Sequence, residues 1–512
     1  MVGKKRSHVN KKIVMYILVC LCIFIIPTAR VCASSDVIEN NNSGIPDKEL
    51  YKVILKKLGK KSNQKFTKQE AAKITSLDAS FKKIKTLKGM KYLKNLKKLY
   101  VQGCGLKNLK GIQGLTNLQS LDMTYNSVKS LKPLKNLKNL KKINAHNNNL
   151  KSLSGIEKLT KLKEADFDYN NLESVKELKK LTNIKKISLR FNNLTSLKGF
   201  GKKKIDRLEL EGNNLTNIAG LEKLKNLKYL DVKNNEITSL SGVEYLTKLE
   251  ELNASRNKLT SIREVGGLRK LKKLDVDQNQ LTSLNGIEHL QKLEWLLARS
   301  NCLSSLTDMR QLKSLVLLCV DDNCLSSINE IPGLPKLETF GIRYNKITEL
   351  PDLSSISGFR SIGFCFNNLK ETKEELKAKL PQNYFSYYNN YYDEIIHNFE
   401  EDFSRQNIDY SMNITEPAGV EQINGNTTRI AGQIHMPAEK IQITMIDNLN
   451  DEDGFTEYYY ADVDKNGNFV FENLDLIKYV KGKLDMNIGI CMEYDKNNEV
   501  YLHTGLRWYR IK

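Results

Sequence analysis

The stretch "LKKLDVDQNQLTSLNGIEHLQK", residues 271 to 292, is one copy of a 22-residue repeat that decides the fold of this 512-residue chain. The repeat reads LxxLxLxxNxLxxLxxLxxLxx, and it recurs in phase fourteen times. Twelve repeats carry Asn at position 9, from Asn126 to Asn367. One repeat, beginning at Ile184, is a residue shorter than the others, beside "GFGKKK". The repeats begin at Ile74, Leu96, Leu118, Leu140, Leu162, Ile184, Ile205, Leu227, Leu249, Leu271, Leu293, Leu315, Leu337 and Phe359.

The spacing predicts a strand in every repeat, followed by a short return path. Positions 4 and 6 should face the core, whereas positions 3, 5 and 7 should face the opposite surface. A single repeat cannot bury its apolar face alone, so the strands should stack into a parallel sheet over one continuous core. The Asn column would satisfy buried backbone groups at the turn out of each strand. A return path of about nine residues favours extended or short 3₁₀ segments over long helices. This pattern is typical of a leucine-rich repeat solenoid with its parallel sheet on the concave face.

Different patterns precede and follow the repeats. Residues 45–75 have helical apolar spacing, and "ETKEELKAKL" after the last repeat predicts a second, C-terminal cap helix. From about Ser411, short stretches of alternating residues separated by Gly, Asn and Asp predict a β-sandwich. We therefore expect a signal peptide (1–33), a helical N-terminal cap (34–73), leucine-rich repeats with a cap helix (74–383), a Tyr-rich acidic connector (384–410) and an Ig-like β-sandwich domain (411–512).

With its helical cap, the run "ITSLDAS" entering the first repeat, the 22-residue period and the β-rich segment behind the repeats, the chain resembles the internalin family. These are secreted proteins of Gram-positive bacteria. The resemblance covers roughly residues 45 to 475, and it implies a solenoid that binds a protein partner. Two features depart from the family. The chain has no LPxTG sorting motif, and it ends in "GLRWYRIK" without a hydrophobic tail, so covalent attachment to the cell wall is not expected.

The first 33 residues have the layout of a secretory signal peptide, with a basic start, the apolar run "IVMYILVCLCIFIIP" and small residues before the expected cleavage after Ala33. A retained membrane anchor is the alternative, although a 15-residue run is short for a span. We expect an extracellular protein, either free or non-covalently associated with the wall. Of the net charge of +22, residues 1–33 carry +6 and residues 384–512 carry −11, which leaves +27 on residues 34–383.

The sequence predicts no catalytic residue, no cofactor and no metal site. The stretch 462–472 resembles the start of a calcium-binding loop, but the twelfth position is Asn473, so a β-hairpin turn at Asn466–Gly467 is preferred. The repeat pattern places no nucleophile or carboxylate to work with His146, so we predict that the protein is not an enzyme. The solenoid should stay folded without metal, which melting in EDTA would test.

The six cysteines beyond residue 33 include no CxxC pair and no His–Cys cluster, so they do not support a zinc site. Cys302 and Cys324 both occupy position 10, in adjacent repeats. Their backbones should be about one strand spacing apart, which is near the range that permits a disulfide. Two reduced side chains stacked beside the Asn column are the alternative, and we prefer it.

Most of the concave face should be a lattice of charges, because position 3 often carries Lys and position 5 often carries an acid. The eleventh and twelfth repeats break this pattern. Trp295 and Leu317 stand at position 3, and Leu297 and Cys319 stand at position 5. We expect an exposed apolar cluster with a polar rim, as a protein-binding hot spot requires. This Trp295 patch comprises Trp295, Leu297, Arg299, Leu317, Cys319, Asp321, Arg343 and Tyr344. The alternative is that the C-terminal module folds back and covers the patch.

Two functions from different classes fit the sequence. The first is a secreted or surface-associated protein that binds a protein on a host or neighbouring cell through its concave face. The second is a cell-envelope protein whose basic solenoid adheres electrostatically to anionic wall polymers. Nucleic acid is not an expected partner, because the signal peptide directs the chain out of the cytoplasm, and no membrane span is expected after cleavage. Salt should weaken wall adhesion far more than an apolar hot spot.

Overall fold

The computed structural model describes residues 36–381 and the shorter segments 412–416, 429–434, 440–447, 456–462, 464–466, 468–472, 474, 486–493 and 507–510. The expected signal peptide and the expected connector at 384–410 lie outside these residues. None of the helices in the described part of the chain is long and apolar enough to cross a membrane.

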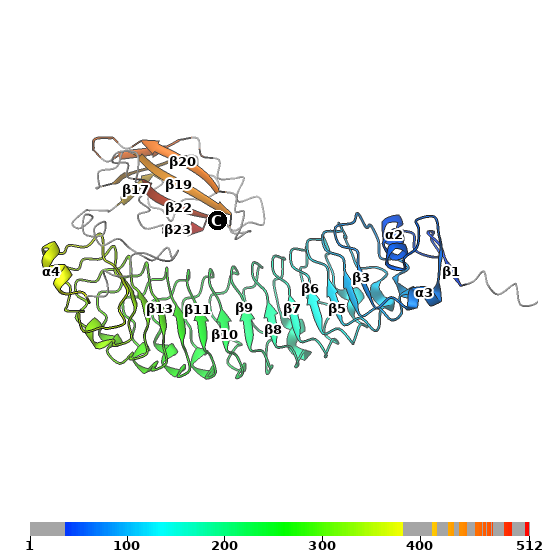
Figure 1. Cartoon of the computed structure of the whole chain (residues 1–512), viewed down its shortest axis with the longest axis horizontal. Coiled ribbons are helices and arrows are strands. Elements are labelled where there is room, and N and C mark those ends of the chain that lie inside the picture. The colour runs from blue at the N-terminus through cyan, green and yellow to red at the C-terminus, as the bar shows by residue number, and fades with distance from the viewer. Residues whose placement is uncertain are drawn as a thin grey trace, which may run out of the picture.

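One parallel sheet of fourteen strands forms the body of the protein, and its strand order follows the chain from β3 to β16. Figure 1 shows these strands side by side along a curved array. Each strand covers positions 3 to 5 of one repeat, and like positions lie opposite one another, so Leu274 pairs with Leu252 and with Leu296. The structure thus confirms the predicted leucine-rich repeat solenoid. The strands are β3 Ser76–Asp78, β4 Lys98–Tyr100, β5 Ser120–Asp122, β6 Lys142–Asn144, β7 Glu164–Asp166, β8 Lys186–Ser188, β9 Arg207–Glu209, β10 Tyr229–Asp231, β11 Glu251–Asn253, β12 Lys273–Asp275, β13 Trp295–Leu297, β14 Leu317–Cys319, β15 Thr339–Gly341 and β16 Ser361–Gly363.

The return paths contain short 3₁₀ turns, as their length requires. Their apolar residues join those of the strands in a single core that runs through all fourteen repeats. The shorter repeat places Lys203 beside this core, and the side chain is buried, with only 5% of the residue exposed. Its ammonium donates to the carbonyl of Leu178 at 2.6 Å, and burial lowers its pKa. The 3₁₀ turns are η1 Met90–Tyr92, η2 Ile112–Gly114, η3 Lys132–Leu134, η4 Lys176–Lys180, η5 Val243–Tyr245, η6 Arg263–Gly267, η7 Ile287–His289, η8 Thr307–Met309 and η9 Ile331–Gly333.

The twelve asparagines at position 9 form an asparagine ladder along the edge of the core. In a representative rung, the Nδ2 of Asn257 donates to the carbonyls of Ala254, Ser255 and, one repeat earlier, Val232. Its Oδ1 accepts the Ile237 N–H at 2.9 Å. Each rung therefore satisfies four backbone groups that water cannot reach, and it joins two repeats.

Position 8 adopts a left-handed backbone conformation in every repeat, at Gly in two repeats and at larger residues in twelve. This conformation costs roughly 1 to 2 kcal/mol for a residue with a Cβ atom, and most for a β-branched one. No Val, Ile or Thr occupies the position in any repeat. The conformation turns the chain out of its strand and directs the position-8 side chain along the edge of the sheet.

Two helices and a two-stranded sheet precede the first repeat: α2 Lys48–Lys57, α3 Lys68–Ala72, β1 Val37–Ile38 and β2 Phe66–Thr67. Asp47 begins α2, where one carboxylate oxygen accepts the Leu50 N–H at 3.0 Å. Its other oxygen accepts the Lys85 N–H at 2.7 Å, so the same side chain ties the helix to the first repeat. At the opposite end of the array, α4 Lys373–Ala378 follows the last repeat (Figure 1).

The described C-terminal strands form two antiparallel sheets, in the orders β17-β18-β21 and β20-β19-β22-β23. Asp464 forms the turn between β20 and β21 by accepting the N–H groups of Asn466 and Asn468. This turn links two different sheets, so the prediction that it closes a β-hairpin is wrong. The strands are β17 Met412–Glu416, β18 Ile430–Ile434, β19 Lys440–Asp447, β20 Thr456–Asp462, β21 Asn468–Phe471, β22 Met486–Glu493 and β23 Arg507–Arg510.

Candidate functional site

Positions 3, 5 and 7 form the open face of the repeat sheet, where the sequence predicted the concave surface. Trp295 lies on this face and is 42% exposed. Leu297 of the same strand and Leu317 of the next are partly exposed beside it. The ammonium of Lys273, one repeat earlier, lies 4.3 Å from the centroid of the Trp295 ring, which is cation–π geometry. The apolar centre of the Trp295 patch is therefore present, with a lysine over its aromatic ring.

Two expected members of the Trp295 patch are buried, so the prediction that they are exposed is wrong. Cys319 is outside the core, but it is only 5% exposed between neighbouring repeats, and burial raises its thiol pKa to about 12. Tyr344 is 7% exposed, and its ring stacks on Phe366 at 4.5 Å. Phe81 has the same left-handed backbone but is 70% exposed, so the burial of Tyr344 comes from its stacking on Phe366.

The expected rim residues are tied to neighbouring repeats. The Arg299 guanidinium contacts the Oδ2 of Asp277 through Nε and Nη2, both at 2.7 Å. Asp321 accepts the Arg343 backbone N–H at 2.8 Å, and burial raises the pKa of its carboxyl. These contacts hold the Arg299 and Asp321 side chains in place, so these two would not have to be ordered again on binding.

The charged columns pair differently from the predicted lattice of positions 3 and 5. Arg207 and Glu209 form a pair of the expected kind, but Lys142 contacts Glu164, which also stands at position 3. Position-5 carboxylates instead bond to their own backbone, as Asp231 does with the Lys233 N–H at 3.0 Å. Ions pair mainly along position 7, between adjacent repeats. This position-7 ladder comprises the ion pairs Asp168–Arg190, Glu211–Lys233 and Asp277–Arg299, and the hydrogen bond from the Arg343 backbone N–H to the Asp321 carboxylate.

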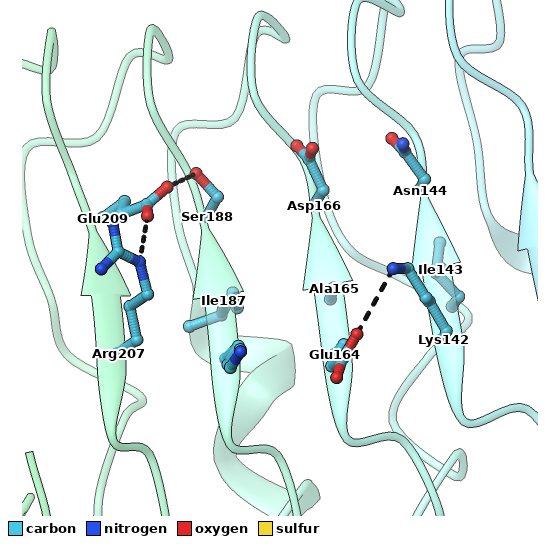
Figure 2. A pocket seen from close by; sticks show the side chains of 11 residues that line it. Lys142, Ile143, Asn144, Glu164, Ala165, Asp166, Ile187, Ser188, Arg207 and Glu209 are labelled. Atoms are coloured by element: carbon cyan, nitrogen blue, oxygen red, sulfur yellow. Dashed lines mark hydrogen bonds and ion pairs between the residues drawn. The ribbon is translucent and has the colours of Figure 1, made fainter.

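A cavity of about 260 Å³ opens on the same face, over β6 to β9 (Figure 2). Small side chains at Ala165 and Ser188 leave this space. Glu209 closes one side, where it accepts the Ser188 hydroxyl at 2.8 Å and the Arg207 Nε at 2.5 Å. The cavity is lined by Lys142, Ile143, Asn144, Glu164, Ala165, Asp166, Lys186, Ile187, Ser188, Arg207 and Glu209. The repeat pattern did not predict this cavity.

Beside this cavity the structure gathers His146, Asp166 and Asp168. The expectation that no carboxylate lies beside His146 is therefore wrong. The sequence held the signal, because His146 and Asp168 both occupy position 7 in adjacent repeats. Burial lowers the pKa of His146 and raises that of Asp166. Burial and the neighbouring Asp166 raise the pKa of Asp168 to about 6, against the opposing charge of Arg190.

The cysteines of position 10 are separate from this face. Cys302 and Cys324 are both exposed and carry free thiols in the structure.

Several carboxylates of the open face are protonated more readily than usual, and Asp231 is a clear case. Burial raises its pKa to about 6, and Glu211 adds to the shift, while the Lys233 backbone N–H opposes it. In the unfolded chain the pKa of Asp is about 3.9, so the folded state binds the proton more tightly. The contribution of Asp231 to stability is therefore full at low pH and is lost as the pH rises from about 4 through about 6.

We expect Asp231→Asn to stabilise the protein once the pH rises above about 4, with the full effect above about 6. The amide keeps an oxygen for the Lys233 N–H but carries no charge to desolvate. At pH 8 the free energy of unfolding should rise by roughly 2 kcal/mol, and at pH 4 it should hardly change. Urea unfolding at the two pH values measures the difference. An equal change at both would show that the charge of Asp231 is not the cause.

Comparison with known proteins agrees with this architecture. A family model described as "Leucine Rich repeats (2 copies)" matches residues 94–136, 116–158, 203–245 and 247–289. No curated protein sequence matches the chain. Among solved structures, a leucine-rich repeat protein of Leptospira interrogans is 31% identical with a TM-score of 0.55, and the match covers 58% of this chain and 79% of that one. The chain belongs to the leucine-rich repeat proteins.

Within that class the chain is internalin-like. The internalin InlF of Listeria monocytogenes is 26% identical with a TM-score of 0.58, and the match covers 63% of this chain and 97% of that one. The functional domain of InlJ from the same organism is 18% identical with a TM-score of 0.54, covering 78% of this chain and 95% of that one. At 18% identity the InlJ match concerns the fold alone.

Proposed function

We propose that this protein binds a protein partner through the open face of its repeat sheet, which we take to be concave, with the Trp295 patch as the anchor. The exposed Trp295 is the observation that carries the proposal. Of the large exposed apolar side chains among the described residues, only Trp295 stands at position 3, 5 or 7. An exposed aromatic ring flanked by partly exposed leucines, with charged groups fixed around it, matches the composition of binding hot spots.

The fold supports this function by analogy. Drosophila Toll, which was solved in complex with Spätzle, matches at 19% identity with a TM-score of 0.53, covering 59% of this chain and 46% of that one. That likeness concerns the fold alone. A repeat sheet of fourteen strands offers a long rigid surface on which side chains of many repeats can meet one partner.

The rest of the proposal follows the sequence. The protein is exported by its N-terminal signal and acts outside the cell, as a non-enzymatic adhesion or interaction protein. The segment containing α2 and α3 caps one end of the solenoid, because Asp47 ties α2 to the first repeat. The two C-terminal antiparallel sheets form an Ig-like sandwich.

The test is binding of the fluorescently labelled full-length protein to intact cultured animal cells and to purified Gram-positive wall fragments. Salt from about 0.05 to 1 M separates the two classes of interaction, because the Debye length falls to about 3 Å at 1 M. A specific protein partner should retain binding on cells, and prior treatment of the cells with a protease should abolish it. Binding that salt removes, and that wall fragments share, would instead identify electrostatic adhesion to wall polymers.

Trp295→Ala should weaken this binding by about 2 kcal/mol or more, the usual scale for a central aromatic anchor. Tyr245→Ala is the matched control. Tyr245 lies in η5 on the return path, is 52% exposed and has Lys225 at 4.8 Å over its ring. Affinity from a binding isotherm on cells should be unchanged by the control. Equal losses in the two variants would remove the Trp295 patch from the proposal.

A further inference from the structure

A cluster of one histidine and two aspartates lies on the open face at the fourth and fifth repeats. His146, Asp166 and Asp168 each offer one ligand atom, and these atoms lie within 4.8 Å of one another. Ligands bound to zinc at about 2.0 to 2.2 Å in tetrahedral geometry are roughly 3.5 Å apart. Side-chain rotations that move each atom by about 1 Å would therefore place all three on one ion.

Each of the three side chains is oriented by its surroundings. The His146 ring lies between Tyr125 and Tyr169, with ring centroids at 5.5 and 5.1 Å. The Oδ1 of Asp166 accepts the Asp168 N–H at 3.0 Å, so its other oxygen points elsewhere. Asp168 accepts the Arg190 N–H at 2.8 Å and the Arg190 Nε at 2.7 Å. Outer contacts of this kind fix ligand side chains in metal sites.

The charge balance and the access route both favour a cation. Arg190 is shared between two acids, since its Nε is 2.7 Å from Asp168 and 3.7 Å from Glu209. The Asp166–Asp168 pair therefore carries more negative charge than Arg190 neutralises. Asp166 also lines the cavity of about 260 Å³ over β6 to β9, which gives water and ions a path to the cluster.

We propose that His146, Asp166 and Asp168 bind a divalent transition-metal ion, for which zinc is the best match. An imidazole with two carboxylates suits zinc, whereas calcium and magnesium prefer sets of oxygen ligands alone. Three protein ligands leave a coordination position for water or for a donor from a bound molecule. The site lies six repeats from Trp295, so it is independent of the proposed partner-binding patch.

The experiment is calorimetric titration of the metal-free full-length protein with zinc chloride at pH 7.5, repeated in competition with a coloured zinc chelator. One equivalent should bind to the unaltered protein. His146→Gln and Asp166→Asn should each weaken this binding roughly tenfold or more. Asp166→Asn keeps an oxygen for the Asp168 N–H, so the local backbone bond survives.

His289→Gln is the control, because the Nε2 of His289 lies 3.5 Å from Glu288 on the return path and tests adventitious His–acid binding. It should leave the affinity unchanged. Circular dichroism checks that the variants fold, and cobalt(II) bound to the unaltered protein provides a second readout. A four-coordinate cobalt ion absorbs strongly in the visible range, whereas the hydrated six-coordinate ion absorbs weakly. Each of three results would overturn the proposal. These are the absence of stoichiometric zinc binding, a weak cobalt spectrum, and a zinc affinity that His146→Gln does not change.

Discussion

Asn257→Ala should lower the free energy of unfolding by roughly 3 to 5 kcal/mol. The substitution removes one rung of the asparagine ladder, which bonds to four backbone groups at 2.9 to 3.1 Å. Asn257 is only 8% exposed, so those groups lose their partner where water reaches them poorly. Each buried polar group left unsatisfied costs about 1 to 3 kcal/mol, and partial entry of water would offset some of the total. Urea unfolding followed by circular dichroism measures the loss.

The chain supplies its own controls for this prediction. Asn226→Ala removes an exposed asparagine whose contact is with the Lys248 ammonium, so it should change stability by less than about 0.5 kcal/mol. Asn257→Cys should fall between the two, because Cys104 occupies the same position in the second repeat and lies 3.1 Å from the Ala79 carbonyl. If Asn257→Ala behaves like Asn226→Ala, the ladder does not stabilise the array.

Leu296→Ala should cost roughly 2 to 5 kcal/mol of stability, because it leaves a cavity in the core. Leu296 is at position 4, is 0% exposed and lies between Leu274 and Leu318 of the adjacent strands. The array already contains one alanine in this column, Ala165, which is 6% exposed below the cavity over β6 to β9. The neighbours of Leu296 pack against a full leucine side chain, so its truncation should leave an empty cavity.

Trp295→Ala, one residue away on the same strand, is the matched comparison. Its side chain is outside the core, so the variant should unfold within about 1 kcal/mol of the unaltered protein. The small cost comes from losing the contact with Lys273. Reversal of the order, with Trp295→Ala the more destabilising, would mean that the two faces of β13 are assigned the wrong way round.

The fold could be predicted because each repeat carries the same spacing of apolar residues. Fourteen in-phase copies fix the strand positions, the core columns and the asparagine ladder, and the structure has one strand in each expected place. The shorter repeat was visible as a deletion, but the role of Lys203 was not. A lysine next to two other lysines in "GKKK" gives no sign that its ammonium is the one that reaches buried carbonyls.

The site could be predicted only in part, since local backbone geometry decides where side chains point. Position 8 holds Phe, Tyr, Asn, Arg, Gln, Ser, Asp and Gly, so the residue type alone does not predict the left-handed conformation at this position. Tyr344 stacks on Phe366 of the next repeat, so it is buried and does not belong to the exposed patch. The pairing of charges was missed for a related reason. Side chains such as Asp231 bond to backbone groups of their own repeat, and a repeat pattern does not show this competition.

The position-7 ladder has a consequence for how such a gene can change in length. From Asp168 to Lys233 and again from Asp277 to Arg343, acids and bases alternate with a period of two repeats, and Ser255 separates the two runs. Loss of the single repeat 293–314 would bring Asp277 beside Asp321, two buried carboxylates without the guanidinium between them. Loss or duplication of a 44-residue pair within the run from Asp277 to Arg343 would preserve the alternation. An interior repeat of this run can therefore be lost without placing like charges side by side only if a neighbouring repeat is lost with it, although the core alone would accept the loss of one.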